Sequence, residues 1–179
     1  MDEVLDRVNS ILEKSSKAGE KQLANGTRLV EPAPQIAPKA WRHVVFAALD
    51  LERIHEIELE RHQRLPQQLE NFFRAFNGIS MFGNELNIWG KRLNYIRIGD
   101  DIWQPFDIVR HNVPSERPNH SPYTVVYFGS TDRGQKWVFF NSVDESIGKT
   151  CRHKFHSEGS WPDFDSWLRD ELQHYDSLS

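Results

Sequence analysis

The chain has little cysteine and methionine, no long apolar run and no large excess of one charge. The single cysteine among 179 residues, Cys151, cannot form a disulfide within the chain, which fits a reducing compartment. With 22 basic and 26 acidic residues the net charge is -4, unlike the strong basic excess of proteins that coat nucleic acid. No apolar run approaches the roughly 20 residues of a membrane-spanning helix. The acidic start, Met1-Asp2-Glu3, does not resemble a secretory signal, so we expect a cytoplasmic protein.

Aromatic residues are abundant for a chain of which only 38% is apolar. There are 11 Phe, 6 Trp and 4 Tyr residues. Because each ring can bury about 150–250 Å², these side chains can close a core in a polar chain. The length fits one domain of roughly 100–200 residues, and the aromatic content argues against disorder.

The first 38 residues differ from the remainder in composition. Apolar residues at helical spacing from Val4 to Leu12 predict a short helix. Glycines and prolines then recur between residues 15 and 38, which favours an extended linker over regular structure. We therefore predict an N-terminal helix and arm over residues 1–38, followed by a domain over residues 39–179.

The next segment is predicted to hold three helices. The spacing of Trp41, Val44 and Val45 suits a helix, and Asp50 suits the N-terminal cap of a second one. Pro66 fits the first turn of a third helix, because proline lacks the N–H that would be unpaired there. Asn77-Gly78 is expected to end this third helix, since both residues tolerate a left-handed backbone.

Beyond Gly78 the apolar period becomes that of strands. Predicted strands lie at residues 86–89, 95–98, 123–128, 136–140 and 151–155. A final helix carries Trp167 on its apolar side and begins at a cap provided by Ser160 or Asp163. The order of elements predicts an α+β fold with a mostly antiparallel, curved sheet of about five strands and helices packed on it.

No motif predicts an active site, a metal or a cofactor. Gly148-Lys149-Thr150 has the end of a phosphate-binding loop, but Val143 stands where that motif needs its first glycine. Cys151, His153 and His156 could bind a metal or form a nucleophilic pair, yet nothing in their spacing supplies a fourth ligand or activates the thiol. We expect no cofactor, and a hydrolase that uses these residues is the third of three functional hypotheses.

A group of residues resembles the signature of the SUKH superfamily, which includes yeast cell-wall-synthesis regulators and bacterial toxin-immunity proteins. In chain order they are Glu58, Leu65, Pro66, Phe72, Phe76, Asn77 and Gly78, with Trp167 in the final helix. The similarity extends roughly from Lys39 to Leu172. The resemblance implies a SUKH-like α+β scaffold. None of the matched residues is expected to act as a nucleophile or to bind a metal. We therefore expect their roles to be structural.

The resemblance makes an immunity protein that binds and neutralises a cognate bacterial toxin the first hypothesis. A regulatory adaptor of the same fold is the second. Residues near turns that leave strands are the predicted partner contacts, because exposed aromatics with a charged rim are typical of interfaces: Trp89, Asp100, Asp101, Trp103, Asp132 and Arg133. We expect a protein partner without direct contact to nucleic acid or membrane, and a chain that is a monomer or a homodimer.

Overall fold

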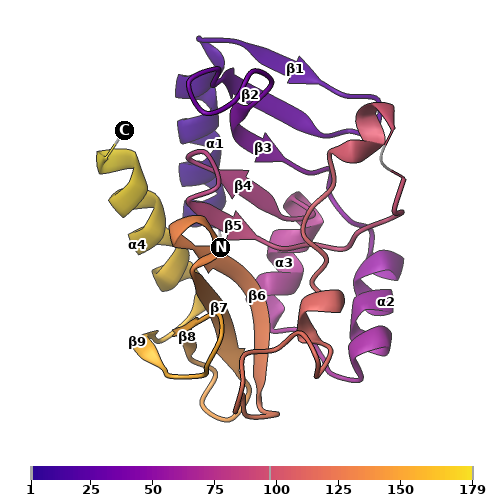
Figure 1. Ribbon diagram of the computed structural model, residues 1–179, viewed down its shortest axis with the longest axis vertical. Coiled ribbons are helices and arrows are strands. Elements are labelled where there is room, and N and C mark those ends of the chain that lie inside the picture. Colours follow the sequence, from indigo (N-terminus) through magenta and orange to yellow (C-terminus); the bar gives the residue numbers. More distant parts are fainter. Residues whose placement is uncertain (1, 97, 179) are drawn as a thin grey trace.

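The computed structural model describes residues 2–96 and 98–178, and in these ranges it shows four α-helices and nine strands (Figure 1). The helices are α1 (Asp2–Ser16), α2 (Leu51–Arg61), α3 (Gln67–Ala75) and α4 (Phe164–Ser177). The strands are β1 (Glu20–Gln22), β2 (Arg28–Pro32), β3 (Trp41–Val45), β4 (Ile79–Met81), β5 (Leu86–Ile88), β6 (Val125–Thr131), β7 (Lys136–Asn141), β8 (Ile147–Cys151) and β9 (Glu158–Trp161). The predicted α+β class is confirmed, with more strands than the expected five.

The strands form one open antiparallel sheet in which spatial order equals chain order, from β1 to β9. Each strand therefore pairs with the next one along the chain. The sheet is twisted: in Figure 1, β1–β5 run across the view, whereas β6 runs down it in the lower half. An irregularity in β6 between Tyr127 and Gly129 lies near this change of direction, and bulges of this kind increase strand twist.

The main core lies between the sheet and the helices. It contains Val8 of α1, Phe72 of α3 and Trp167 of α4, all fully buried, with Val45 of β3 and Phe128 of β6. In Figure 1, α1 and α4 lie side by side along one edge of the molecule. The helix that was predicted near the N-terminus is thus confirmed and belongs to this core.

Two predicted helix caps are also confirmed. The Asp50 side chain accepts a hydrogen bond from the backbone N–H of Arg53 at the start of α2. Asp163, one of the two proposed caps of the final helix, accepts from the backbone N–H of Ser166 in α4. Each carboxylate satisfies a backbone donor that has no partner inside its helix.

Strands β2 and β3 carry buried residues on both faces, whereas β1 is exposed. Neighbouring residues in a strand point to opposite faces, so Val30 and Val45 enter the main core while Leu29 and Val44 do not. The latter two pack with Leu23 and Phe46 in a smaller cluster. Trp41 and Trp103, both half-buried, cover that cluster. The opposite face of this half of the sheet therefore needs a covering segment of its own.

Two sequence predictions in the N-terminal part are wrong. Residues 15–38 were expected to be an extended linker, yet β1 and β2 lie within them. The residues Trp41–Val45 were expected to be helical, but they form β3, paired with β2 and with β4. A strand that is buried on both faces has apolar residues in succession, and over five residues this pattern imitates a helical face. The proposed boundary at residue 38 falls between the paired strands β2 and β3.

Further differences concern short elements. The predicted strand 95–98 contains residue 97, which lies outside the described residues, and residues 95, 96 and 98 are not in a strand. The strand predicted at 151–155 overlaps β8 only at Cys151, where β8 ends. The short strands β4 and β9 were not predicted. None of the helices in the described ranges has both the length and the apolar character that crossing a membrane requires.

Candidate functional site

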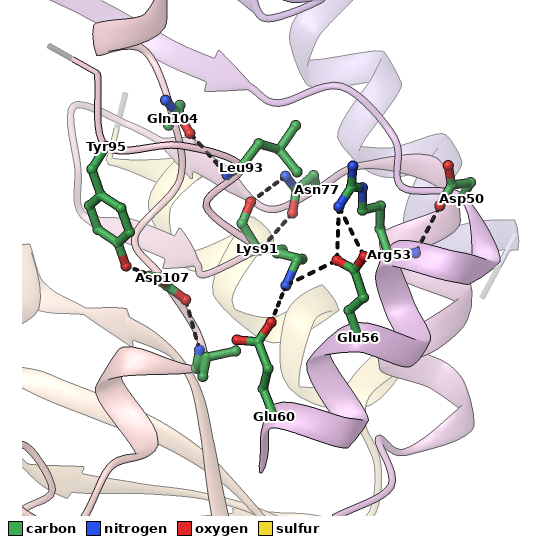
Figure 2. A network of polar contacts seen from close by, with 11 residues as sticks. Asp50, Arg53, Glu56, Glu60, Asn77, Lys91, Leu93, Tyr95, Gln104 and Asp107 are labelled. Atoms are coloured by element: carbon green, nitrogen blue, oxygen red, sulfur yellow. Dashed lines mark hydrogen bonds and ion pairs between the residues drawn. The ribbon is translucent and has the colours of Figure 1, made fainter. Parts of the chain in front are cut away.

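A buried asparagine fixes the point at which the chain leaves β5. Asn77, 3% exposed, donates from Nδ2 to the Lys91 carbonyl (2.8 Å), and its Oδ1 accepts from the Lys91 backbone N–H (2.6 Å) (Figure 2). The backbone at Gly90 lies so close to Asn77 that a Cβ atom there would be 2.2 Å from the Asn77 carbonyl oxygen. We call this arrangement, Asn77 with Gly90 and Lys91, the asparagine clamp.

Helix α2 holds the side chain of the clamped lysine. Lys91 Nζ lies 2.7 Å from Glu60 Oε1 and 3.3 Å from Glu56 Oε2, and the lysine is almost completely buried. Figure 2 shows both glutamates pointing from α2 toward Lys91. Arg53 Nη1 contacts both carboxylate oxygens of Glu56 at 3.0 Å, and this hydrogen bond keeps the pKa of Glu56 below its ordinary value. The segment after β5 therefore starts from a fixed position.

The next segment is shaped by hydrogen bonds within itself. Gln104 Oε1 accepts from the backbone N–H groups of Leu93 (3.0 Å) and Asn94 (3.1 Å). Its Nε2 donates to Asn94 Oδ1 (2.7 Å) and to the carbonyl of Asp101 (2.9 Å). The Tyr95 hydroxyl donates to Asp107 (2.7 Å), a hydrogen bond that raises the pKa of Tyr95. A single glutamine thus joins the two ends of the segment.

The turn between β1 and β2 is hydrogen-bonded to this segment. The Ala24 backbone N–H donates to Asp100 Oδ2 (3.0 Å). Asn25 Nδ2 donates to the carbonyl oxygens of Asp100 (2.9 Å) and Trp103 (3.2 Å). The Trp103 ring covers the smaller cluster on the sheet. Two parts of the chain that are about 75 residues apart in sequence therefore form one surface.

Most large apolar side chains of the segment point to solvent. We call residues 93–106 the apolar loop, and six of its side chains are 50–79% exposed: Leu93, Tyr95, Ile96, Ile98, Ile102 and Phe106. Several large apolar side chains exposed on one loop are a feature of protein-interaction surfaces. The polar side chains of the loop are used to shape its backbone, while its apolar side chains are displayed.

Comparison with known protein families assigns the scaffold. Residues 48–170, more than half of the chain, match the model of the SMI1 / KNR4 family (SUKH-1). The chain belongs to this family. No curated protein matches the chain. The resemblance that the sequence suggested is thus confirmed, and the signature residues of this SUKH-1 protein can be assigned structural roles.

The first half of the SUKH-1 signature closes the turn between α2 and α3. Glu58 Oε1 accepts from the backbone N–H of Leu65 (2.8 Å), which is buried, and Pro66 precedes the first residue of α3. Phe72 and Phe76 then contact each other edge to face, at 5.7 Å between ring centroids. The carboxylate and the proline together set the angle at which α3 enters the core.

The second half of the signature forms the asparagine clamp. Helix α3 ends at Ala75, with Phe76 already extended, so Asn77 does not act as the helix cap that was predicted. Gly78 does have the expected left-handed backbone (φ +86°), and a Cβ atom there would be 2.5 Å from the Ile88 carbonyl oxygen. These two residues connect α3 to β4 and to the chain leaving β5, which explains why they occur together.

Three of the predicted contact residues lie on or beside the apolar loop. Asp100 and Trp103 are half-buried and face the β1–β2 turn, while Asp101 lies between them in the short helical turn Gly99–Ile102. Trp89 was proposed as a contact residue, with packing in the core as the alternative, and it lies in the core. It is 2% exposed, and its ring lies 4.4 Å from His111 and 4.8 Å from Trp137 between centroids.

Asp132 and Arg133 lie in a different part of the molecule, in the turn between β6 and β7. Asp132 accepts a hydrogen bond from the Tyr175 hydroxyl of α4 (2.8 Å), and burial together with this bond raises the pKa of Tyr175. The exposed Arg133 pairs with Glu85 (2.7 Å). The structure therefore does not bring these two residues together with the loop residues.

The residues proposed for a hydrolase lie at and after the end of β8. Cys151 ends β8, the His153 carbonyl accepts from Asn119, and the His156 backbone N–H donates to Thr150. Within residues 2–96 and 98–178, no three His, Cys, Asp or Glu side chains are grouped closely enough to hold a metal ion.

Sequence reasoning missed the residues that build the loop and the apolar ones that it displays. Neither Asn25 nor Gln104 belongs to a sequence pattern that indicated its role. The exposed residues Tyr95, Ile96 and Ile98 were assigned to a strand. In the sequence Arg97 separates Ile96 from Ile98, as in a strand with one face in water, so the pattern gave no signal of a loop.

Proposed function

We propose that this SUKH-1 protein is a non-catalytic binding module that neutralises a cognate protein toxin, and that it docks through the apolar loop. The observation that carries the proposal is the group of six exposed apolar side chains on a loop whose backbone is held by its own polar groups. Membership of the SMI1 / KNR4 family supports a role of this kind, because the superfamily includes toxin-immunity proteins.

The proposed mechanism is steric occlusion. A loop whose shape is fixed before binding loses little conformational entropy when it docks, so its apolar area can contribute to affinity. Asp101 and Arg92 at the edge of the loop supply charges that select the partner, as charges at an interface rim do. By covering the active site or the substrate surface of the toxin, the protein would need no catalytic group of its own. We expect this binding to occur in the cytoplasm.

The test is co-expression with the protein encoded beside this gene. We expect the full chain to restore growth and to co-purify with that protein. Ile98→Asp places a charge in the centre of the apolar loop and should weaken binding by about tenfold or more, the effect of losing one interface anchor. Val143→Asp is the matched control, since Val143 is 74% exposed in the β7–β8 turn, far along the chain from the loop.

The outcomes separate the hypotheses. Equal binding by Ile98→Asp and Val143→Asp would show that the apolar loop is not the docking surface. Binding without rescue of growth would favour the regulatory adaptor of the same fold, which would use the same loop for a partner that is not toxic. Asp132 and Arg133 stay predicted as contacts of a second site, and their alanine variants belong in the same assay.

A further inference from the structure

A second feature lies between the C-terminal end of α2 and the loop that precedes β6. It is a cavity of about 190 Å³ lined by Glu60, Arg61 and Gln63 on one side and by Asn112, Pro114 and Arg117 on the other. Two arginines thus face one small cavity, which we call the arginine pocket. In Figure 1 the short helical turn that contains Asn112 lies between β6 and α2.

Arg61 is the more buried of the two arginines. Its Nε and Nη1 atoms are buried and have no hydrogen-bond partner within the described residues. The remaining nitrogen, Nη2, makes one long contact of 3.4 Å with Gln63 Oε1. A guanidinium normally uses its five N–H groups when it is buried, so this one retains most of its donor capacity.

Arg117 is held in place by hydrogen bonds that use only one of its three nitrogen atoms. Its Nη2 donates to the carbonyl oxygens of Pro122 (2.6 Å) and Val125 (3.0 Å). The guanidinium carbon lies 5.5 Å from the centre of the Tyr127 ring. Its Nε is buried and has no partner among the described residues. The side chain is therefore positioned by backbone groups and an aromatic ring, while its charge is not neutralised.

No carboxylate in the described part of the chain forms an ion pair with either arginine. Glu60 is occupied by Lys91 at 2.7 Å, and Glu58 accepts from the Leu65 N–H, although its charge still acts on Arg61. Burial and the neighbouring Arg117 lower the pKa of Arg61 to about 10, so both arginines are still charged at neutral pH. Two buried like charges without a counter-ion are unfavourable, and an anion between them would offset that cost.

We infer that the arginine pocket binds a phosphate group, either as the free ion or as the terminal group of a small phosphomonoester. Two guanidinium groups line this one cavity, so its positive charge matches a phosphate group with its roughly two negative charges better than a carboxylate with one. Arginine also binds phosphate oxygens through charge-assisted hydrogen bonds. The inference does not depend on the function proposed for the apolar loop.

The experiment titrates the full chain with sodium phosphate at constant ionic strength, with sodium chloride as the reference. The Nε–H signals of the arginine side chains in NMR spectra report the contact directly, and the thermal unfolding midpoint reports the linked stability. We expect saturable shifts of the Arg61 and Arg117 signals together with a rising midpoint. Phenyl phosphate and acetate form two further arms of the titration.

Variants separate binding from a structural role. Arg61→Gln removes a buried charge that has no ion pair, so in chloride it should unfold at a midpoint no lower than that of the wild type, while its response to phosphate is lost. Arg61→Lys keeps the charge without the Nε donor and should bind phosphate about tenfold more weakly, the value of one charge-assisted hydrogen bond. Arg133→Gln, which changes an exposed arginine paired with Glu85, is the matched control and should bind as the wild type does.

Each result decides one part of the inference. Saturation by inorganic phosphate alone identifies the free ion as the ligand, and tighter binding of phenyl phosphate identifies a phosphomonoester. Acetate binding as strong as phosphate binding would overturn the assignment to phosphate. The absence of any saturable shift, or an unchanged phosphate response in Arg61→Gln, would overturn the site itself.

Discussion

In the body of the protein, formed by the sheet and its four helices, apolar side chains are buried and buried polar groups hold neighbouring segments together. Asn77 binds both backbone groups of Lys91, and Glu58 binds the N–H of Leu65. In the apolar loop the polar side chains also bind backbone, as Gln104 does, but the large apolar side chains face solvent. Both regions are therefore fixed in shape, yet six apolar side chains of the loop, unlike Trp103, bury little surface in the isolated chain.

This difference separates residues needed for folding from residues available for binding. The family signature lies wholly in the body, where each matched residue has an internal contact that explains it. An exposed isoleucine or leucine contributes little to the free energy of folding. Six large apolar side chains exposed on one loop, four of them isoleucine or leucine, therefore add little to the stability of the isolated chain, as the proposed docking role requires.

Substitution of two glycines, one in the body and one in the loop, should give the largest difference in the free energy of unfolding. In Gly90→Ala the new Cβ atom would lie 2.2 Å from the Asn77 carbonyl oxygen and 2.3 Å from its Oδ1, so the asparagine clamp must open. We expect a loss of about 3 kcal/mol or more in the free energy of unfolding. In Gly99→Ala, within the apolar loop, the Cβ atom would meet nothing within 4 Å, and the positive φ of 60° should cost about 1 kcal/mol.

Urea unfolding followed by tryptophan fluorescence measures both variants. Equal losses at the two positions would contradict the distinction between body and loop, because they would mean that backbone strain matters and the clamp does not. Asn77→Ala in the background of Gly90→Ala provides a further check. The new methyl group has already opened the clamp, so removing the Asn77 side chain should then add less damage than Asn77→Ala causes in the wild type.

The next largest expected effect is the loss of stability at low pH. It arises from a buried histidine in the body. His43 in β3 is 1% exposed, and its Nε2 lies 3.2 Å from Ser15 Oγ. Burial lowers the pKa of His43 to about 4, against the opposing effects of Glu31 and Asp176, while Arg42 acts in the same direction as burial. The folded protein therefore keeps this histidine neutral.

The sign of the pH effect follows from the two pKa values. Between the unfolded value of about 6.5 and the folded value of about 4, the unfolded chain binds a proton that the folded chain does not. Stability is thus complete above about pH 6.5 and falls by about 3 kcal/mol as the pH approaches 4. Urea midpoints across this range measure the slope, which should flatten in His43→Gln but persist in His153→Gln, where the histidine is exposed. A slope unchanged in His43→Gln would assign the effect to other groups.

The sequence predicted the body better than the loop for physical reasons. Helix α1 and helix α4 each bury one face, so their apolar period of about 3.6 residues is visible without the rest of the protein. Strand β3 was mistaken for a helix because both of its faces are covered, one of them by Trp103 from a segment about 60 residues later. Such coverage depends on tertiary contacts and leaves no periodic mark in the strand.

The candidate site was only partly predictable. The sequence directed attention to Asp100, Asp101 and Trp103 through their turn signals, and these residues do lie in the apolar loop. Trp89 was misjudged because its burial comes from Trp137 on a strand that is not its neighbour in the chain. Residues 95–98 resembled a strand, but backbone groups nearby pair with the side chain of Gln104 in place of another strand. Pairing of this kind cannot be read from apolar alternation.

The smallest expected change in the free energy of unfolding belongs to a substitution in the loop. The same substitution, isoleucine to serine, is compared at one buried and one exposed position. Ile88→Ser in β5 changes a side chain that is 1% exposed, and the lost burial with its cavity should reduce the free energy of unfolding by about 3 kcal/mol. Ile98→Ser changes a side chain that is 79% exposed and should alter it by no more than about 0.5 kcal/mol. Urea unfolding of both variants under the same conditions provides the measurement. If Ile98→Ser were as damaging as Ile88→Ser, the loop would be packed in solution against the protein itself. Its apolar side chains would then be part of the core, and they would no longer be available to a partner.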